Sequence, residues 1–248
     1  MTTTPPRKTP IILIAGHWLG AWAWDAVVDA LNAAQWQVVP MTLPGLDPRD
    51  RDRRSRTLAD QVDAIEQLSE RLGCSQEEPA VIVAHSGANA PVTVFLDRHP
   101  DLVRRVIWVD SGPLASGMAF APDLPEEIVE LPLPPFDQLA GQASVEGLSD
   151  TDLQQFRERA VSQPASVLRD PVVLHDPGRA RVLTTLICCS FPSAQVLELA
   201  QSGHPMFAPI AELERVEVVD LPTGHWPMWS RPQDLAQLIL GETAVSDG

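Results

Sequence analysis

A serine stands where a short apolar run meets a string of small residues, in the stretch AVIVAHSGANAPV (80–92). The pattern G-x-S-x-G holds a nucleophilic serine on a strained turn between a strand and a helix, and it needs small outer residues so that the turn can close. Ala84 and Ala88 occupy the two outer positions here, and alanine is still small. Ser86 is therefore a candidate nucleophile. The alternative is a serine that caps an ordinary helix.

A histidine far along the chain could supply the base that such a serine needs. A hydroxyl is a weak nucleophile and is activated by an adjacent general base. The segment DLPTGHWPMWSRP (220–232) places His225 on a Thr-Gly loop, after the last strand-like run and before the last helical stretch. A surface-loop histidine is the alternative. Position and residue type both match what Ser86 requires, so we predict that the two side chains meet.

Three carboxylates are candidates for the acid that would orient the imidazole and stabilise its protonated form. Asp110 ends the run RRVIWVD and is favoured, because the strand that it ends is expected to lie beside the one bearing Ser86. Its alternative role is to cap the segment that follows. Glu198 and Asp220 are the other candidates. Asp220 is only five residues from His225 and is expected to shape that loop.

Two backbone N–H groups are expected to hold the oxyanion of an acyl-transfer reaction. One belongs to Gly87, at the start of the helix after the serine. The other belongs to His17 in the segment IAGHWLGAWAW (14–24), which follows the first apolar run. The imidazole of His17 either lines the pocket or packs.

Four tryptophans flank these motifs. Trp18 and Trp226 each lie one residue from a proposed site residue and are candidates for the wall of a substrate pocket. Core packing is the alternative for rings of this size, above all for Trp22 and Trp229.

The apolar pattern places the candidate residues at the ends of strands. Six short runs predict strands, at 10–16, 36–45, 80–86, 104–110, 181–191 and 215–222. Segments with apolar residues at helical spacing lie between most of these runs. One helix is expected to begin after Thr57 and to stop at Gly73. Strands that are apolar throughout and alternate with helices predict a three-layer α/β sandwich with a parallel sheet. Its active site would lie at the carboxyl ends of the strands.

The stretch 111–180 interrupts this alternation. It contains the proline-rich segment PDLPEEIVELPLPPF, followed by helical pieces around 149–162 and 164–169. We predict a small, mainly helical cap over the site, inserted into a core made of residues 10–110 and 181–242. Residues 1–9 and 243–248 are expected to be flexible tails, and the charged run 47–56 a solvated loop.

Composition limits the partners. The chain has 248 residues and a formal net charge of −15, which argues against nucleic acid and anionic membrane surfaces. Its three cysteines, Cys74, Cys188 and Cys189, form no metal-binding motif and suggest reduced thiols in the cytoplasm. The run IILIAG is too short for a signal peptide or a membrane span. We expect a small-molecule substrate and neither metal nor cofactor, and the sequence leaves a homodimer open.

Four segments resemble those of the α/β-hydrolases, in the same order: GHWLGAWAWDAVVDAL, VAHSGA, VRRVIWVDS and GHWPMWSRPQDLA. The resemblance is to the compact branch of small-molecule esterases and hydroxynitrile lyases, and it covers nearly the whole chain except the cap. It implies Ser86 as nucleophile, His225 as base, and N–H groups of His17 and Gly87 as the oxyanion hole.

The chain departs from the family pattern at two places. Ala15-Gly16 stands where the family usually has His-Gly. The family often places its acid after the strand that follows the cap, where this chain has Ser190-Phe191-Pro192. Some members instead use an acid after the strand that precedes the cap, which here is Asp110.

The chemistry expected of this set is two-step acyl transfer on an ester or lactone, through an acyl-enzyme. A serine nucleophile argues against epoxide hydrolase and dehalogenase chemistry, which need a carboxylate. A lyase that uses Ser86 and His225 as acid and base remains an alternative, and so does a non-catalytic protein that binds a small ligand. The sequence does not separate them, because the cap reads the substrate.

Overall fold

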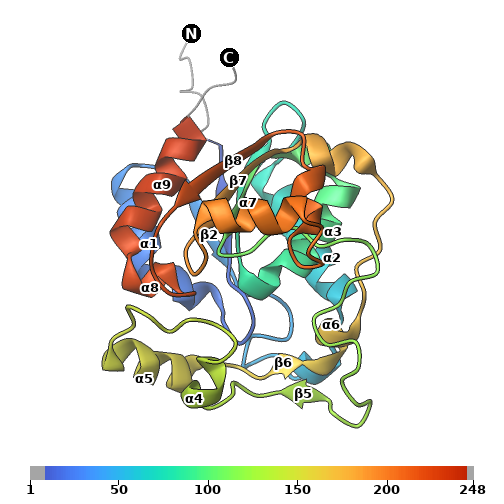
Figure 1. Ribbon diagram of the computed structural model, residues 1–248. Helices are drawn as coiled ribbons and strands as arrows, with labels where there is room; N and C mark the ends of the chain where they lie inside the picture. Colours follow the sequence, from blue (N-terminus) through green and yellow to red (C-terminus); the bar gives the residue numbers. More distant parts are fainter. Residues whose placement is uncertain (1–8, 245–248) are drawn as a thin grey trace.

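A central parallel sheet organises the computed structural model, which describes residues 9–244 (Figure 1). Its strands are β1 (Ile11–Ile14), β2 (Val38–Met41), β3 (Ala80–His85), β4 (Val103–Val109), β7 (Leu183–Cys188) and β8 (Val216–Asp220). They lie in the order β2-β1-β3-β4-β7-β8, and each neighbouring pair is parallel. The strand order reverses between β1 and β3, which is where sheets of this kind bind ligands.

Helices cover both faces of the sheet, which confirms the predicted three-layer α/β sandwich. Side chains of Ile12 and Ile14 pack into one core layer, whereas Ile11 and Leu13 pack into the other, as the alternation of a strand requires. The first layer lies under α2 (Leu58–Leu72), α3 (Asn89–Arg98) and α7 (Ser193–Gln201), and the second under α1 (Asp25–Ala33), α8 (Pro227–Ser230) and α9 (Pro232–Ala244).

Both ends of α2 are set by the residues that the sequence indicated. The Thr57 hydroxyl accepts a hydrogen bond from the backbone N–H of Asp60, and the Asp60 carboxylate accepts one from the backbone N–H of Thr57. Gly73 ends the helix with a φ of 71°, a left-handed conformation that glycine adopts without strain. The helix therefore begins and ends as predicted.

The chain between β4 and β7 forms a layer at the end of the sheet opposite the termini (Figure 1). It contains the helices α4 (Phe136–Leu139), α5 (Asp150–Arg159) and α6 (Ala165–Arg169), and a 3-10 helix (Pro177–Arg181) leads into β7. Two short strands, β5 (Glu130–Leu131) and β6 (Gln163–Pro164), pair antiparallel with each other and not with the main sheet. The sequence predicted neither α4 nor this pair of strands, because the apolar residues in these segments follow neither the helical nor the strand periodicity.

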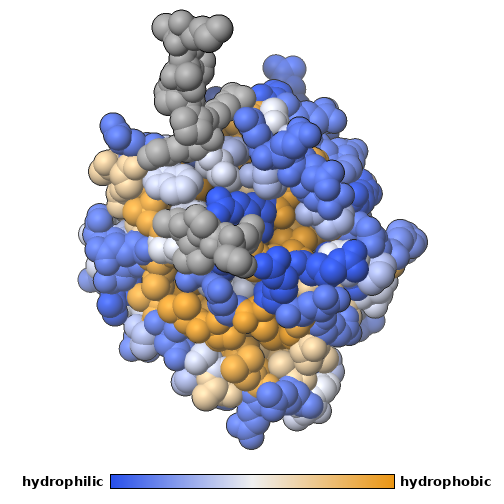
Figure 2. All heavy atoms as spheres, turned by 90° about the horizontal axis from the view of Figure 1, so that it is seen from above, coloured by the Kyte–Doolittle hydropathy of each residue, from blue (hydrophilic) through white to orange (hydrophobic). Residues whose placement is uncertain are grey.

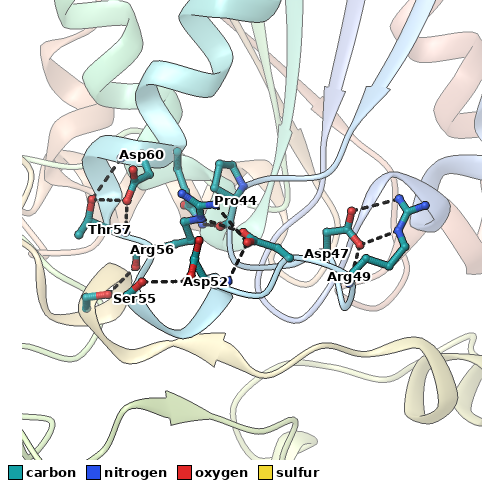
Figure 3. Close-up of polar contacts among 11 residues, drawn as sticks. Pro44, Asp47, Arg49, Asp52, Ser55, Arg56, Thr57 and Asp60 are labelled. Carbon is teal, nitrogen blue, oxygen red and sulfur yellow. Dashed lines mark hydrogen bonds and ion pairs between the residues drawn. The ribbon is translucent and has the colours of Figure 1, made fainter.

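The charged run 47–56 is mostly exposed, as the sequence predicted, and polar contacts such as the one between Asp47 and Arg49 order it (Figure 3). It also contacts the cap. The guanidinium of Arg53 lies 2.6 Å from the carboxylate of Glu130 in β5, and both side chains are about four-fifths buried. The hydroxyl of Ser166 in α6 donates to the backbone carbonyl of Arg56 at 2.5 Å. The run therefore anchors the cap to the core, through contacts more than 70 residues apart that composition does not reveal.

The last helix continues past the predicted end of the core. It runs to Ala244, and the side chain of Thr243 is buried with its hydroxyl donating to the carbonyl of Leu240. The flexible tail predicted from residue 243 onward is therefore wrong for residues 243 and 244. The other residues of that tail, like residues 1–8, lie outside the described part of the chain.

Figure 2 shows the end of the molecule that carries the termini, where hydrophilic residues surround an apolar area. Within residues 9–244, no helix has the length and apolar character needed to cross a bilayer.

Candidate active site

Ser86 lies on a sharp turn between β3 and α3. Its φ of 51° is in the left-handed region, which a residue with a side chain adopts only under strain. Gly16, in the loop after β1, packs directly against this turn, since a methyl group on Gly16 would lie 2.6 Å from Cβ of Ser86. The hydroxyl of Ser86 is turned toward His225 and does not cap α3. The geometry is that of a nucleophile elbow.

Three side chains from separate segments form one hydrogen-bonded chain. Nε2 of His225 lies 2.8 Å from Oγ of Ser86, and Nδ1 of His225 lies 2.6 Å from Oδ2 of Asp110. The imidazole is 16% exposed and the carboxylate 8%, so little water competes for these bonds. The order of a hydroxyl, an imidazole and a carboxylate lets the histidine take a proton from the serine while the carboxylate holds its tautomer.

The carboxylate of Asp110 is fixed by the segment that follows β7. Its Oδ1 accepts hydrogen bonds from the N–H groups of Cys189 and Ser190, at 3.0 and 2.8 Å, and its Oδ2 accepts one from the Ser190 hydroxyl at 2.6 Å. Burial alone would raise the pKa of Asp110, but the bonds from His225 and Ser190 outweigh it and lower the pKa to about 2. Asp110 is therefore ionised wherever the protein is folded near neutral pH.

Ser190 was not among the predicted site residues. The sequence marked it only as a position without charge, at the place where relatives often carry the acid. The structure gives that position a different part, because the strand end without a carboxylate donates hydrogen bonds to the carboxylate of the neighbouring strand. The short polar side chain two residues after the end of β7 was the available signal.

The two competing acids lie elsewhere. The carboxylate of Asp220 accepts hydrogen bonds from the N–H and the hydroxyl of Ser193, at 2.7 and 2.8 Å, and so holds the start of α7. Glu198 is exposed on α7. Neither carboxylate hydrogen-bonds to His225 within the described residues.

The loop that carries His225 is held by both the cap and the elbow. The N–H of His225 donates to the carbonyl of Ser144 at 2.7 Å, and the N–H of Gly224 donates to the carbonyl of Glu146 at 3.1 Å. Glycine is required at 224, because a methyl group there would lie 2.5 Å from the Glu146 oxygen. Nε2 of His85, the residue before the nucleophile, bonds the carbonyl of His225 at 2.7 Å. The position of His225 thus depends on the cap.

His85 should make the folded protein sensitive to acid. Burial and the neighbouring His225 lower the pKa of His85 to about 3, whereas an unfolded histidine titrates near 6.5. The unfolded state then binds the proton first, so stability is complete above pH 6.5 and is lost as the pH falls toward 3. We expect His85→Gln to remove up to about 1.4 kcal/mol per pH unit of this dependence.

Urea unfolding at several pH values between 7 and 4 measures the effect. The amide of glutamine can still donate to the His225 carbonyl, so the variant is expected to fold. His204→Gln, at an exposed position, is the matched control. Parallel curves for the wild type and His85→Gln would show that His85 does not carry this acid sensitivity.

The two loops that carry the predicted oxyanion donors pack against each other at Gly16, the residue before His17. A methyl group on Gly16 would lie 2.9 Å from the backbone nitrogen of Gly87. Within the described residues, neither the N–H of His17 nor that of Gly87 has a hydrogen-bond acceptor. Both residues line the same cavity as Ser86. Two N–H groups beside the serine are thus available to a developing negative charge.

A cavity of about 770 Å³ lies between the core and the cap, and Ser86, Asp110 and His225 are part of its wall. Trp18 and Trp226 line it, and the indole N–H of Trp18 donates to the carbonyl of Leu131 in β5. Trp22 and Trp229 instead stack on each other with ring centroids 5.7 Å apart, outside the cavity wall. This separates the two tryptophans proposed for the pocket from the two whose alternative was packing.

Sequence reasoning missed the apolar rim of this cavity. Its wall includes three large apolar side chains that are exposed by 44–62%, namely Phe120 from the cap, Phe191 after β7 and Met206 after α7. These side chains come from segments without periodic pattern, so no local signal marked them. Among residues 9–244, no three His, Cys, Asp or Glu side chains are grouped to hold a metal ion.

The sheet order, the elbow and the site at the strand ends define a class of protein. The model of the alpha/beta hydrolase family matches residues 11–238, and the chain belongs to that family. Among known proteins it is similar to Methylesterase 8 of Arabidopsis thaliana, with 29% identity over 111 residues, and to Esterase PIR7B of Oryza sativa subsp. japonica, with 32% over 117 residues. These matches cover 42% and 44% of this chain, and 38% and 41% of the relatives. The matched chain thus spans less than half the length of either relative.

Solved structures share the fold over nearly the whole chain. An extracellular alpha/beta-hydrolase from a Paenibacillus species superposes with a TM-score of 0.74 at 16% identity, covering 94% of this chain and 98% of that one. A methylesterase from Arabidopsis gives 0.70 at 16% identity, covering 95% and 99%. A pyrethroid hydrolase from Sphingobium faniae gives 0.65 at 21% identity, covering 95% and 97%.

Proposed function

We propose that the protein is a serine hydrolase that cleaves a small ester or lactone through an acyl-enzyme intermediate. The hydrogen-bonded chain from Ser86 through His225 to Asp110 is the observation that carries the proposal. The esterase and methylesterase names of its relatives support ester chemistry.

The reaction follows from the positions of the groups. His225 takes the proton from Ser86 as the oxygen attacks the substrate carbonyl, and the N–H groups of His17 and Gly87 hold the resulting oxyanion. The protonated imidazole, stabilised by Asp110, then gives its proton to the leaving oxygen. Water activated by His225 releases the acid from Ser86 in the same way.

The cavity favours an uncharged substrate. None of the described residues that line it is Lys or Arg, whereas Glu146 and Asp170 do line it. An anionic ester would meet no cation there and would be repelled by the net charge of −15. The apolar rim formed by Phe120, Phe191 and Met206 suits hydrocarbon groups. The carboxylate product would leave the site for the same electrostatic reason that keeps anionic substrates out.

Two observations weigh on the alternatives. A lyase that expels an anion such as cyanide would depend on protonated His225 alone to receive it, because the described residues that line the cavity include no Lys or Arg. A protein that only binds ligands does not need Ser86 strained at a φ of 51° and bonded to a histidine. Hydrolysis is therefore the better supported function. We also place the protein in the cytoplasm, in keeping with three cysteines that form no disulfide within the described residues.

A fluorophosphonate reagent tests the proposal without knowledge of the substrate. Because the reagent phosphonylates an activated serine, we expect one adduct per chain, mapped by peptide mass spectrometry to the peptide that contains Ser86. Turnover of short-chain aryl esters is measured in parallel. No adduct at high reagent concentration, or an adduct on another serine, would rule out the covalent mechanism.

A further inference from the structure

The imidazole of His17 fills the space above Gly87, next to the reacting serine. A methyl group placed on Gly87 would overlap the imidazole ring, so the absence of a side chain at 87 makes room for it. The ring packs edge-on against Phe120, with centroids 4.5 Å apart, and against Trp18 at 5.8 Å. His17 is 9% exposed and lines the cavity. The two positions are therefore complementary in shape.

This imidazole has polar atoms without protein partners. Among residues 9–244, no group hydrogen-bonds to either ring nitrogen of His17. Burial and the nearby His225 lower the pKa of His17 to about 4, so the ring is neutral near pH 7 and offers one donor and one acceptor. A ligand in the cavity would supply the missing partner.

The location of the ring restricts which part of a substrate it can reach. Its own backbone N–H is one of the two proposed oxyanion donors, so the ring flanks the carbonyl oxygen. The leaving oxygen must face Nε2 of His225 to receive a proton, which leaves the acyl side of the substrate beside His17. In a 2-hydroxy ester the hydroxyl prefers to lie on the same side as the carbonyl oxygen, because the two form an internal hydrogen bond.

We infer that the His17 imidazole is a specificity-determining residue that hydrogen-bonds a hydroxyl on the carbon next to the scissile carbonyl. The preferred substrates are then uncharged 2-hydroxy esters. This inference rests on the proposed function, since it assumes that the ester carbonyl lies between Ser86 and the two N–H groups.

Two matched pairs of esters test the inference. Methyl mandelate and methyl phenylacetate differ only in the 2-hydroxyl, whereas 2-methoxyethyl and butyl phenylacetate differ only on the alcohol side. For wild type we expect kcat/KM to favour mandelate over phenylacetate by about 2- to 10-fold, the size of one hydrogen bond between neutral groups. His17→Phe keeps an aromatic ring and the backbone N–H but removes the ring nitrogens. It should reduce this preference to about one.

The preference ratio separates binding from damage to the site. A general loss in His17→Phe lowers both rates alike and cancels in the ratio. His17→Asn, which restores a donor and an acceptor, should recover part of the preference. An equal ratio in wild type and His17→Phe would overturn the inference, and so would a dependence on His17 confined to the alcohol-side pair. Absence of both ester turnover and fluorophosphonate labelling in wild type would instead overturn the proposed function, and the inference with it.

Discussion

Replacing Ser86 with alanine is expected to reduce kcat on any ester that the wild type cleaves by about 10⁴- to 10⁶-fold. The variant loses the only atom that can form the acyl-enzyme, while the oxyanion donors and the cavity stay in place. Some acceleration over water should therefore persist, with KM little changed. Alanine keeps the backbone and the Cβ atom, and the variant loses a single side-chain hydrogen bond, the one to His225. We therefore expect the fold to be kept.

A neighbouring serine provides the matched control for Ser86→Ala. Ser111 also lines the cavity, but its hydroxyl bonds the backbone carbonyl of Ala84 and not His225. Ser111→Ala should retain kcat within about tenfold, the loss of one modest hydrogen bond. Steady-state kinetics and circular dichroism of the two variants make the comparison. Substantial turnover by Ser86→Ala would mean that water is activated directly by His225, without a covalent intermediate.

The sheet was predictable because its signals are local. The central strands β1, β3 and β4 are short, mostly apolar runs that are almost wholly buried, and such a run is enough to recognise a buried parallel strand. Thr57, Asp60 and Gly73 specify the two ends of α2 by bonds within one or two turns. From the strands alone it follows that residues after β3 and β4 meet at one edge of the sheet, which is why the sequence could place Asp110 near Ser86.

The parts that were not predictable depend on contacts between distant segments. His85 bonds the carbonyl of His225 across 140 positions of sequence. Ser190 holds Asp110 across 80 positions, and Arg53 reaches Glu130 in the cap. Neither spacing nor composition encodes such pairs. The ring of His17 above Gly87 belongs to the same class, because shape complementarity between two loops leaves no periodic trace.

The loss of the Asp110 carboxylate should have the second largest effect. Asp110→Asn is expected to lower kcat/KM by about 10³- to 10⁴-fold while the protein stays folded. The amide oxygen can still accept the N–H bonds of Cys189 and Ser190. The amide nitrogen then faces Nδ1 of His225 as a donor, so Nδ1 must give up its proton. The remaining proton sits on Nε2, where the imidazole can no longer accept one from Ser86.

Asp220 offers a control with the same local chemistry two strands away, at the end of β8. Its carboxylate accepts an N–H and a hydroxyl from Ser193, as Asp110 does from Ser190, but it bonds no histidine. Asp220→Asn should therefore leave kcat/KM within about threefold, since a surface hydrogen bond contributes little. Measured together, the two variants separate the loss of a strand-end carboxylate from the loss of the partner of His225. If Asp110→Asn kept nearly full activity, the carboxylate would only brace the loop after β7, and the base would be oriented by its backbone bonds to Ser144 and His85.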